Sequence, residues 1–396
     1  MLTGSFPIDR FRQMETPFYY YDLRLLRQTL AVIAANAPED NFHVHYAMKA
    51  CAAPEVVRLI AKAGLGADCV SGGEIRAALE AGIPPQRIVF AGVAKADWEI
   101  ALALDAGILC FNVESPEELQ VINQLAEARG VHARVCLRVN PEIDAHTHKH
   151  ITTGMAENKF GIPLDDMPQV VRSCTELPCI DFLGLHFHIG SQITDMQPFR
   201  ELCARVNQLV SQTERSGVHV SHINVGGGLG INYEHPNHMP IADFRSYFDV
   251  FRHSLQVLDG RILHFELGRS VVAPCGSLIT RVLYVKQGKE KRFAIVDAGM
   301  TDLIRPALYN AFHRIENISA NGPVDATYDV VGPICESSDV FVRNFDMAVA
   351  HRGDLLAIRS AGAYGEIMAS CYNLRRLPGH ICSDDTEAGQ DSAAEV

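Results

Sequence analysis

The sequence predicts a (β/α)8 barrel, also called a TIM barrel, followed by a smaller antiparallel β domain. Three observations lead to this fold class. Strand-like and helix-like segments alternate along about 230 residues, close to the usual size of such a barrel. The strand-like runs are short and apolar, and the helical runs repeat apolar residues at spacings of three and four. After residue 270 the helical period ends, and short alternating runs are broken by Gly, Pro, Asn and Asp.

Eight strands are predicted for the barrel. The first is FHVHYAMK at 42–49, in which apolar residues alternate with polar ones. The others lie at 66–71, 87–92, 109–114, 133–140, 182–190, 222–228 and 262–268. Helices are predicted between them at 53–64, 72–82, 96–107, 115–130, 165–177, 197–217 and 241–258. This alternation implies parallel strands joined by right-handed crossovers. A doubly wound open sheet is the structural alternative.

The residue patterns at the two ends of the chain differ from the alternating strands and helices of the barrel. The segment TPFYYYD at 16–22 is strand-like, so residues 1–25 are expected to add an edge strand to the β domain. The barrel is then expected over 26–270 and the β domain over 271–380. Residues 381–396 are acidic and lack aromatic side chains, which predicts a disordered tail.

Composition limits the classes of partner. A net charge of −12 argues against nucleic acid, because phosphate binding needs a basic face. No run of about 18 apolar residues is present, so no membrane span is expected, and the N-terminus has no secretory signal pattern. The 11 cysteines form no CxxC pair. They predict reduced thiols in a cytoplasmic protein, and no bound metal is expected.

The first candidate for chemistry is Lys49, at the end of the first barrel strand, where barrels of this kind carry their active sites. The ordinary interpretation of such a lysine is a stem lying on apolar surface with its amine in water. A partly desolvated lysine is instead nucleophilic and condenses with an aldehyde.

Three further strand ends fit a cofactor with an aldehyde. Gly226, Gly227 and Gly228 follow the seventh strand, where backbone N–H groups can approach a phosphate, although glycine runs also make ordinary turns. Glu266 lies inside an apolar strand and needs a cationic partner, which a protonated pyridine nitrogen or a nearby arginine could supply. His188 could lie flat on a ring, or could be a histidine satisfied in the core. Together these residues predict a site for pyridoxal 5′-phosphate (PLP).

Seven motifs occur between residues 15 and 380 in the order YAMKA, GLHFHIGSQ, NVGGGLG, FELGRS, LIRPALYNAFH, CESSD and GAYG. With them the chain resembles the fold-type III PLP-dependent decarboxylases. The resemblance implies a barrel with a C-terminal β domain, PLP as cofactor, and a homodimer with shared active sites. It is strongest to members that convert meso-2,6-diaminopimelate to L-lysine and CO2, the last step of lysine biosynthesis.

The resemblance also implies roles for barrel residues. Lys49 would bind the cofactor covalently, with Asp68 near it, and His188 would stack on the ring. Glu266 would contact the pyridine nitrogen. The phosphate contacts would come from Ser191, Gly226, Gly227, Gly228, Gly268 and Arg269.

Substrate contacts are implied for the later motifs. Arg269, Arg305 and Tyr309 would bind the distal carboxylate of the substrate. Tyr364 would contact cofactor and substrate. The resemblance further implies that Cys335 and Glu336 reach in from the other subunit, and either Cys335 or Lys49 would return a proton to the substrate carbon.

Two positions depart from the family pattern, and three other functions stay open. Leu267 stands where the family usually has proline, and Cys51 where it usually has asparagine; a modest local effect is expected. A first alternative is decarboxylation of ornithine, arginine or carboxynorspermidine. A second is a metal-dependent hydrolase that uses His186 and His188. A third is a non-catalytic PLP-binding homologue.

Overall fold

The computed structural model describes residues 6–143, 159–320 and 322–384. The chain divides into two compact units. The barrel unit comprises Leu30–Gly230 and Asp243–Gly268, and the β unit comprises the remaining segments, Met1–Thr29, Ile231–Ala242 and Arg269–Val396. The expected tail begins at 381, but Ile381 and Cys382 end a strand that pairs with the N-terminal strand; residues 385–396 lie outside the described residues.

Eight parallel strands close into a barrel, so the predicted fold class is confirmed and the open sheet is excluded. The strands are β2 (Phe42–Ala47), β3 (Gly66–Cys69), β4 (Ile88–Phe90), β5 (Cys110–Val113), β6 (Ala133–Arg138), β7 (Ile180–His186), β8 (His222–Asn224) and β9 (Ile262–Leu267). The ring closes where β9 pairs with β2 in parallel, with His45 opposite Glu266. All eight correspond to the predicted runs.

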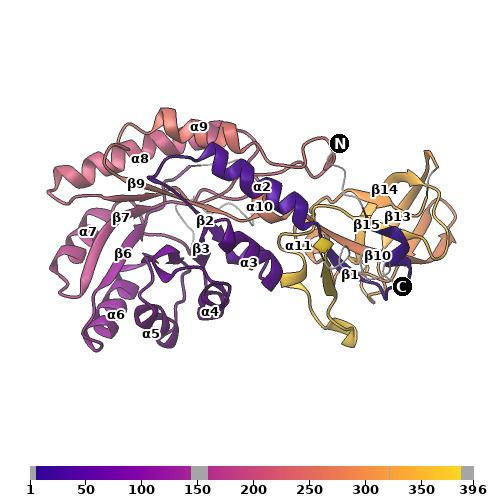
Figure 1. Cartoon of the computed structure of the whole chain (residues 1–396), viewed down its shortest axis with the longest axis horizontal. Helices are drawn as coiled ribbons and strands as arrows, with labels where there is room; N and C mark the ends of the chain where they lie inside the picture. The colour runs from indigo at the N-terminus through magenta and orange to yellow at the C-terminus, as the bar shows by residue number, and fades with distance from the viewer. Residues whose placement is uncertain (1–5, 144–158, 321, 385–396) are drawn as a thin grey trace, which may run out of the picture. The chain divides into compact units, whose positions relative to one another are not determined.

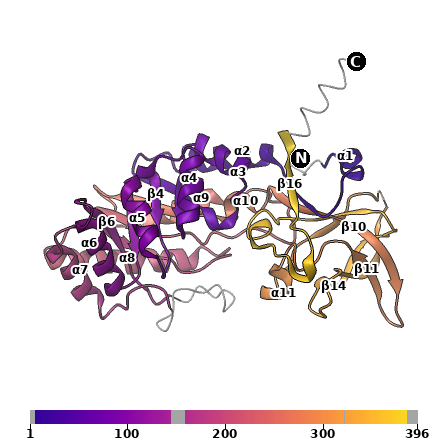
Figure 2. The same cartoon turned by 90° about the horizontal axis from the view of Figure 1, so that it is seen from below.

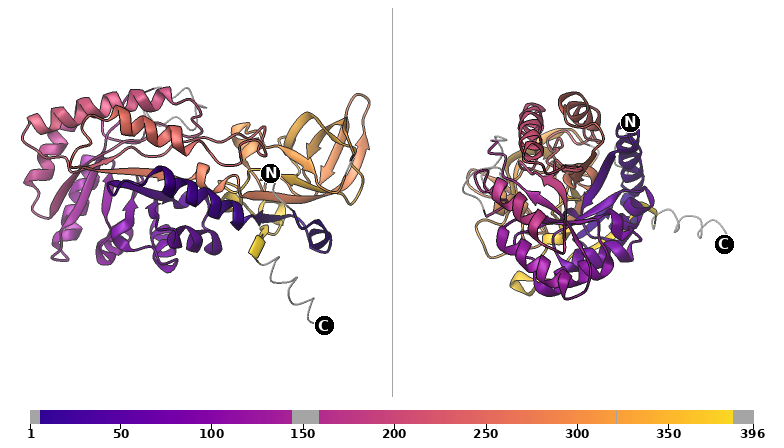
Figure 3. Two further views of the ribbon diagram at one scale, coloured as in Figure 1. Left: turned by 45° about the horizontal axis from the view of Figure 1, so that its top comes forward. Right: turned by 90° about the vertical axis from the view of Figure 1, so that its left-hand side faces the viewer.

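Helices alternate with these strands and surround them, which the end-on view in the right panel of Figure 3 shows. They are α3 (Pro54–Lys62), α4 (Gly72–Glu80), α5 (Asp97–Ala106), α6 (Pro116–Glu127), α7 (Met167–Glu176), α8 (Gln197–Arg215) and α9 (Phe244–Ser254). Each lies within a predicted helical segment. An additional helix, α2 (Leu23–Asn36), precedes the barrel and was not predicted.

Capping residues explain where these helices begin. Ser71 and Ser115 are the N-caps of α4 and α6, and each side chain accepts a hydrogen bond from the backbone N–H three residues later. Pro116 follows Ser115 at the first helical position, where its missing N–H costs nothing. α5 ends at Gly107, which has a left-handed conformation.

The β unit is built around the long strand β10 (Gly276–Gln287). Its sheet has the order β12-β15-β10-β11-β13-β14, and β1 (Phe18–Tyr21) also pairs with β10 and with β16 (Gly379–Cys382). The other strands are β11 (Arg292–Val296), β12 (Ile315–Asn317), β13 (Val324–Val331), β14 (Val340–Ala348) and β15 (Leu355–Ile358), most of which carry labels in Figures 1 and 2. Pairing is mostly antiparallel, but β11–β13 and β1–β16 are parallel.

Short helical pieces complete the described residues: α1 (Ile8–Arg12), α10 (Arg269–Val272) and α11 (Arg305–Tyr309). No helix among the described residues is long and apolar enough to cross a membrane. The packing of the barrel is clearest beside β9, where Phe265 contacts the rings of Tyr247, Phe248 and Phe251 on α9. Phe265 lies on the face of β9 opposite to that of His264 and Glu266, so these two polar side chains point into the barrel.

Candidate active site

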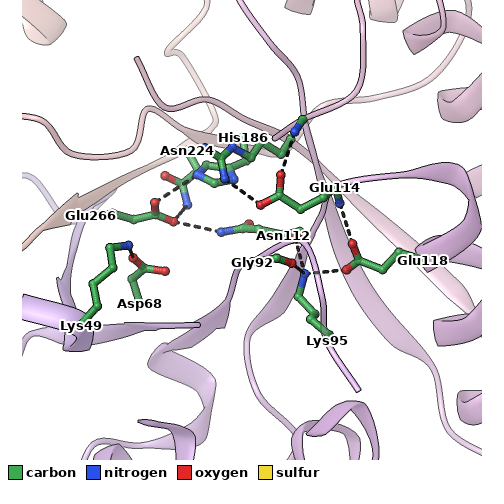
Figure 4. A network of polar contacts seen from close by, with 12 residues as sticks. Lys49, Asp68, Gly92, Lys95, Asn112, Glu114, Glu118, His186, Asn224 and Glu266 are labelled. Atoms are coloured by element: carbon green, nitrogen blue, oxygen red, sulfur yellow. Dashed lines mark hydrogen bonds and ion pairs between the residues drawn. The ribbon is translucent and has the colours of Figure 1, made fainter. Parts of the chain in front are cut away.

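Lys49 lies in a short 3-10 turn, Met48–Ala50, directly after β2. Its Nζ donates to Asp68 Oδ2 at 2.9 Å, and the two side chains face each other in Figure 4. Asp68 is fully buried, and its second oxygen, Oδ1, has no hydrogen-bond partner among the described residues. Burial and the nearby Glu266 raise the pKa of Asp68 above its ordinary value, while Lys49 opposes this shift. The lysine amine is therefore held by one buried carboxyl group.

Glu266 on β9 is a buried carboxylate with three contacts inside the barrel. Its Oε1 accepts from Asn112 Nδ2 at 2.9 Å and from Asn224 Nδ2 at 2.7 Å, and its Oε2 lies 3.1 Å from His186 Nε2 (Figure 4). Burial would raise the pKa of Glu266, but His186 and Lys49 outweigh burial and the pKa falls below its ordinary value. Glu266 is thus ionised, and since a carboxylate accepts about four hydrogen bonds, Oε2 can accept one more.

The glycine run after β8 has a backbone that side chains would disturb. Gly226 has φ +69° and Gly228 φ +109°. A Cβ at Gly226 would lie 2.4 Å from Phe187 O, and one at Gly227 would lie 1.9 Å from Glu266 O. Only glycine fits here without a shift of the backbone. The run carries no side chains of its own, so a phosphate can approach its backbone closely. The N–H groups of Gly226 and Gly227 already donate to Asn224 and His188, so a phosphate would meet another N–H of the run or replace one of these contacts.

His188 and Ser191 follow β7. The Nδ1 atom of His188 accepts from Gly227 N at 3.3 Å, so the ring is tied to the glycine run. Burial, with Arg138 and Lys49 nearby, lowers the pKa of His188 to about 3, so the imidazole is neutral. Ser191 is half-buried. A neutral, half-buried imidazole is suited to stack against a flat ring.

A second polar network anchors the strand ends around this site. The amine of Lys95, 1% exposed, donates to Gly92 O at 2.7 Å, Asn112 O at 2.8 Å and Glu118 Oε1 at 2.6 Å. It thereby fixes the backbone of Asn112, whose side chain contacts Glu266 (Figure 4). Beside it, Arg138 donates to Glu114 at 2.7 Å.

The β unit holds a cluster of two buried arginines. Arg269 and Arg305 both donate to the hydroxyl of Tyr233, at 2.7 and 3.0 Å. Arg305 also lies 2.9 Å from His313 Nε2, and His313 Nδ1 lies 2.9 Å from Arg359 O. Burial raises the pKa of Tyr233, but the two guanidinium groups outweigh it and lower the pKa. Since neither of the hydrogen-bonding partners of Arg305 in this cluster is a carboxylate, its charge is available to an anion.

Other predicted residues of the β unit lie near this cluster or on the exposed CESSD segment. Tyr364, with φ +57°, has its ring 5.0 Å from the guanidinium of Arg269. Tyr309 is half-buried at the end of α11. Cys335 and Glu336 are exposed; Glu336 accepts from Tyr372 at 2.7 Å, and the backbone N–H of Cys335 donates to Asn373.

The barrel residues fit PLP. A phosphate would meet the glycine run, a protonated ring nitrogen would meet the remaining acceptor of Glu266, and the aldehyde would meet Lys49. Two buried atoms, Asp68 Oδ1 and His186 Nδ1, have no partner among the described residues, which marks the centre of the barrel as a polar place still open to a ligand. No group of three or more His, Cys, Asp or Glu side chains in the described ranges could hold a metal ion.

Sequence analysis missed several residues of these two clusters. Asn112 and Asn224 stand in strand-like runs, and no pattern indicates that both reach Glu266. Tyr233 and His313 are far apart in sequence, yet their rings lie edge to face 5.0 Å apart and both contact Arg305. The two departures from the family pattern are both buried: Leu267 ends β9 opposite Tyr46, and the Cys51 carbonyl accepts from Tyr46 at 2.8 Å.

Comparisons with known proteins show the family to which the chain belongs. The family described as "Pyridoxal-dependent decarboxylase, pyridoxal binding domain" matches residues 24–273. A diaminopimelate decarboxylase of Bacteroides thetaiotaomicron is 59% identical over 97% of this chain and 100% of that relative. One of Helicobacter pylori is 42% identical over 92% of this chain and 89% of the relative. The crystal structure of the Helicobacter pylori enzyme complexed with L-lysine has a TM-score of 0.89 and 40% identity, covering 95% of this chain and 93% of that chain.

Proposed function

Because this chain belongs to the family of pyridoxal-dependent decarboxylases, we propose that it removes one carboxyl group of meso-2,6-diaminopimelate as CO2 and releases L-lysine, the last step of lysine biosynthesis. One observation carries the proposal: a lysine amine, a glycine cradle and an ionised carboxylate converge at one end of the barrel. The enzyme is accordingly a carboxy-lyase, with PLP as its cofactor.

When bound, PLP supplies an aldehyde that joins an amine and a protonated ring that accepts the electron pair of a broken carbon–carboxyl bond. Lys49 would be the amine that holds the aldehyde. Asp68, 2.9 Å from Lys49 Nζ, orients that amine. Glu266, whose pKa lies below its ordinary value, would accept from the ring nitrogen and so favour its protonated form. His188, neutral and hydrogen bonded to Gly227, would stack on the ring.

The distal end of the substrate carries a carboxylate and an ammonium group, and the β unit supplies partners for both. Arg305 and Arg269 bind the carboxylate by charge-assisted hydrogen bonds, with Tyr309 and Tyr364 beside them. Glu336 binds the ammonium group. Ornithine presents only an ammonium group at this end, so a buried, positively charged Arg305 would disfavour it. This charge pattern supports diaminopimelate over the alternative decarboxylase substrates.

The active form is a homodimer in which Cys335 and Glu336 complete the site of the other subunit. The proposal is supported by the surface on which they lie. Both residues are exposed, and they are hydrogen bonded to Tyr372 and Asn373, in a second exposed segment. That segment includes Leu374, which is 97% exposed, with Leu377 57% exposed. Large apolar side chains are seldom left this exposed unless a partner covers them. Cys335 Sγ and Lys49 Nζ are the two candidates for returning the proton to the carbon.

A cytoplasmic location is part of the proposal, because all 11 cysteines are free thiols, most of them buried. The sulfur atoms of Cys110 and Cys136 lie 3.9 Å apart and are not joined by a disulfide. Such a set of thiols is typical of a reducing compartment.

The test is an absorbance spectrum of the purified chain followed by addition of meso-2,6-diaminopimelate. We expect a cofactor band that shifts on addition, with release of L-lysine and CO2. Ornithine, arginine and carboxynorspermidine serve as controls and should react at least tenfold more slowly. A chain without bound cofactor, or one that prefers another amino acid, would contradict the proposal; a cofactor band without turnover would indicate a non-catalytic homologue.

A further inference from the structure

The two ends of the cofactor site are joined by one side chain, Asn224, the last residue of β8. Its Oδ1 accepts from the backbone N–H of Gly226 at 2.9 Å, and its Nδ2 donates to Glu266 Oε1 at 2.7 Å. Gly226 is the first glycine of the phosphate cradle, and Glu266 is the carboxylate assigned to the ring nitrogen. Asn224 therefore contacts both anchor points of a cofactor that it need not touch itself.

The orientation of the Asn224 amide is unambiguous. Gly226 N–H can only donate, and an ionised Glu266 can only accept. A flipped amide would put two donors face to face at one end and two acceptors at the other. Asn224 is 1% exposed, so water cannot replace either lost contact. The amide is thus locked in one orientation by groups of opposite hydrogen-bonding character.

The backbone reinforces the same link. Glu266 N donates to Gly226 O at 2.8 Å, so these two residues are already paired across β8 and β9. Gly226 itself has φ +69° and no room for a Cβ, a conformation that needs support from its surroundings. The hydrogen bond from Gly226 N–H to Asn224 provides that support.

We propose that Asn224 is a positioning residue that couples the phosphate cradle to Glu266, so that the phosphate and the ring nitrogen of PLP are bound as one rigid unit. Asn112 is a natural comparison. Its Nδ2 also donates to Glu266 Oε1, at 2.9 Å, but its other hydrogen bonds lead to Lys95 and Cys110 rather than to the glycine run. Asn112 should therefore act on the ring end alone.

The test uses the full-length chain freed of PLP and measures its dissociation constants for PLP and for pyridoxal, which lacks the phosphate. Their ratio reports how much the phosphate contributes to binding. Asn224→Leu removes both contacts, and we expect the ratio to fall at least tenfold, in line with the loss of a buried hydrogen bond. Asn112→Leu should weaken both ligands alike and leave the ratio within about twofold of the wild type.

A conservative variant separates the two roles. Asn224→Asp keeps an acceptor for Gly226 N–H, but its carboxyl group, beside the Glu266 carboxylate, can donate to Glu266 only when one of the two is protonated. Because the acceptor for Gly226 N–H is kept, its ratio should also stay near that of the wild type. Inorganic phosphate, added as a competitor, should bind Asn224→Leu more weakly than it binds Asn224→Asp. A purely structural role would lower the affinity for both ligands equally and would not divide the variants in this way.

Each outcome decides the matter. An unchanged ratio in Asn224→Leu, or a ratio in Asn224→Asp that falls as far as in Asn224→Leu, overturns the inference. Should Asn224→Leu fail to fold, Asn224→Ala, which removes the same two contacts, replaces it in the comparison with Asn224→Asp. The inference rests on the proposed cofactor, but the two failures differ: a wild-type chain that binds no PLP refutes the cofactor, whereas normal PLP binding with equal ratios refutes only the role of Asn224.

Discussion

Replacing Arg305 by alanine should raise the KM for meso-2,6-diaminopimelate strongly while leaving cofactor binding unchanged. Arg305 is 6% exposed, and neither of its hydrogen-bonding partners in the arginine cluster, Tyr233 and His313, is a carboxylate. A hydrogen bond to a charged group contributes about 1.5–3 kcal/mol. Since 1.4 kcal/mol corresponds to a factor of ten, the expected rise in KM is about 10- to 100-fold.

The assay is steady-state decarboxylation, followed by the release of CO2, with the cofactor absorbance recorded on the same samples. Arg343→Ala is the matched control, because Arg343 is an arginine of the same unit whose side chain is 57% exposed and 3.8 Å from Asp329. Exposed pairs of this kind contribute about 0–1 kcal/mol, so its KM should stay near that of the wild type. If Arg305→Ala and Arg343→Ala behave alike, Arg305 does not bind the distal carboxylate.

Three further results are expected. Borohydride reduction followed by peptide mass mapping should find a pyridoxyl group on Lys49, and none on that peptide in Lys49→Ala; an adduct elsewhere would contradict the assignment. Gly226→Ala should weaken PLP binding at least tenfold because its Cβ would lie 2.4 Å from Phe187 O, whereas Gly260→Ala, which has the same φ of +69° but nothing within 4 Å, should leave PLP binding unchanged by titration. Burial lowers the pKa of His45 to about 4, so the unfolded chain takes up this proton near pH 6.5 and the folded chain only near pH 4. His45 should therefore stabilise the folded chain fully above pH 6.5, and about 3 kcal/mol of this contribution to the free energy of unfolding should be lost down to pH 4. Circular dichroism in urea at several pH values measures it, and an equal slope in His45→Gln would refute it.

The eight strands and the seven helices that follow them could be predicted because each has a local signal. Apolar alternation marks β2, and serine caps mark the starts of α4 and α6. The helix α2 was missed although its signal is present: Leu23, Leu26, Leu30 and Ile33 recur at three and four, and the Asp22 side chain accepts from Leu25 N at 3.0 Å. The strand-like run just before it led the prediction to treat this segment as a domain boundary.

Some residues of the candidate site could likewise be predicted from the sequence, and others could not. Lys49, Glu266 and the glycines could be chosen from sequence because a barrel brings all its strand ends to one side. Asn112 could not, since β5 and β9 are not neighbours in the barrel and their side chains meet only across its interior. The link between Tyr233 and His313 likewise depends on the folding of the β unit, which no local pattern encodes.

The polar side chains of the barrel interior include Glu266 and a separate layer of three histidines. The charge of this histidine layer affects Glu266. Below Glu266, His45 and His222 both hydrogen bond to His264, at 2.9 and 2.8 Å. Burial lowers the pKa of all three, so at neutral pH this layer carries no charge. On β9, His264 and Glu266 are two residues apart on the same face, about 6.6 Å along the strand. A protonated His264 at that distance would be a further positive charge near the carboxylate, so the neutrality of the histidine layer leaves His186 and Lys49 as the groups that hold the pKa of Glu266 down.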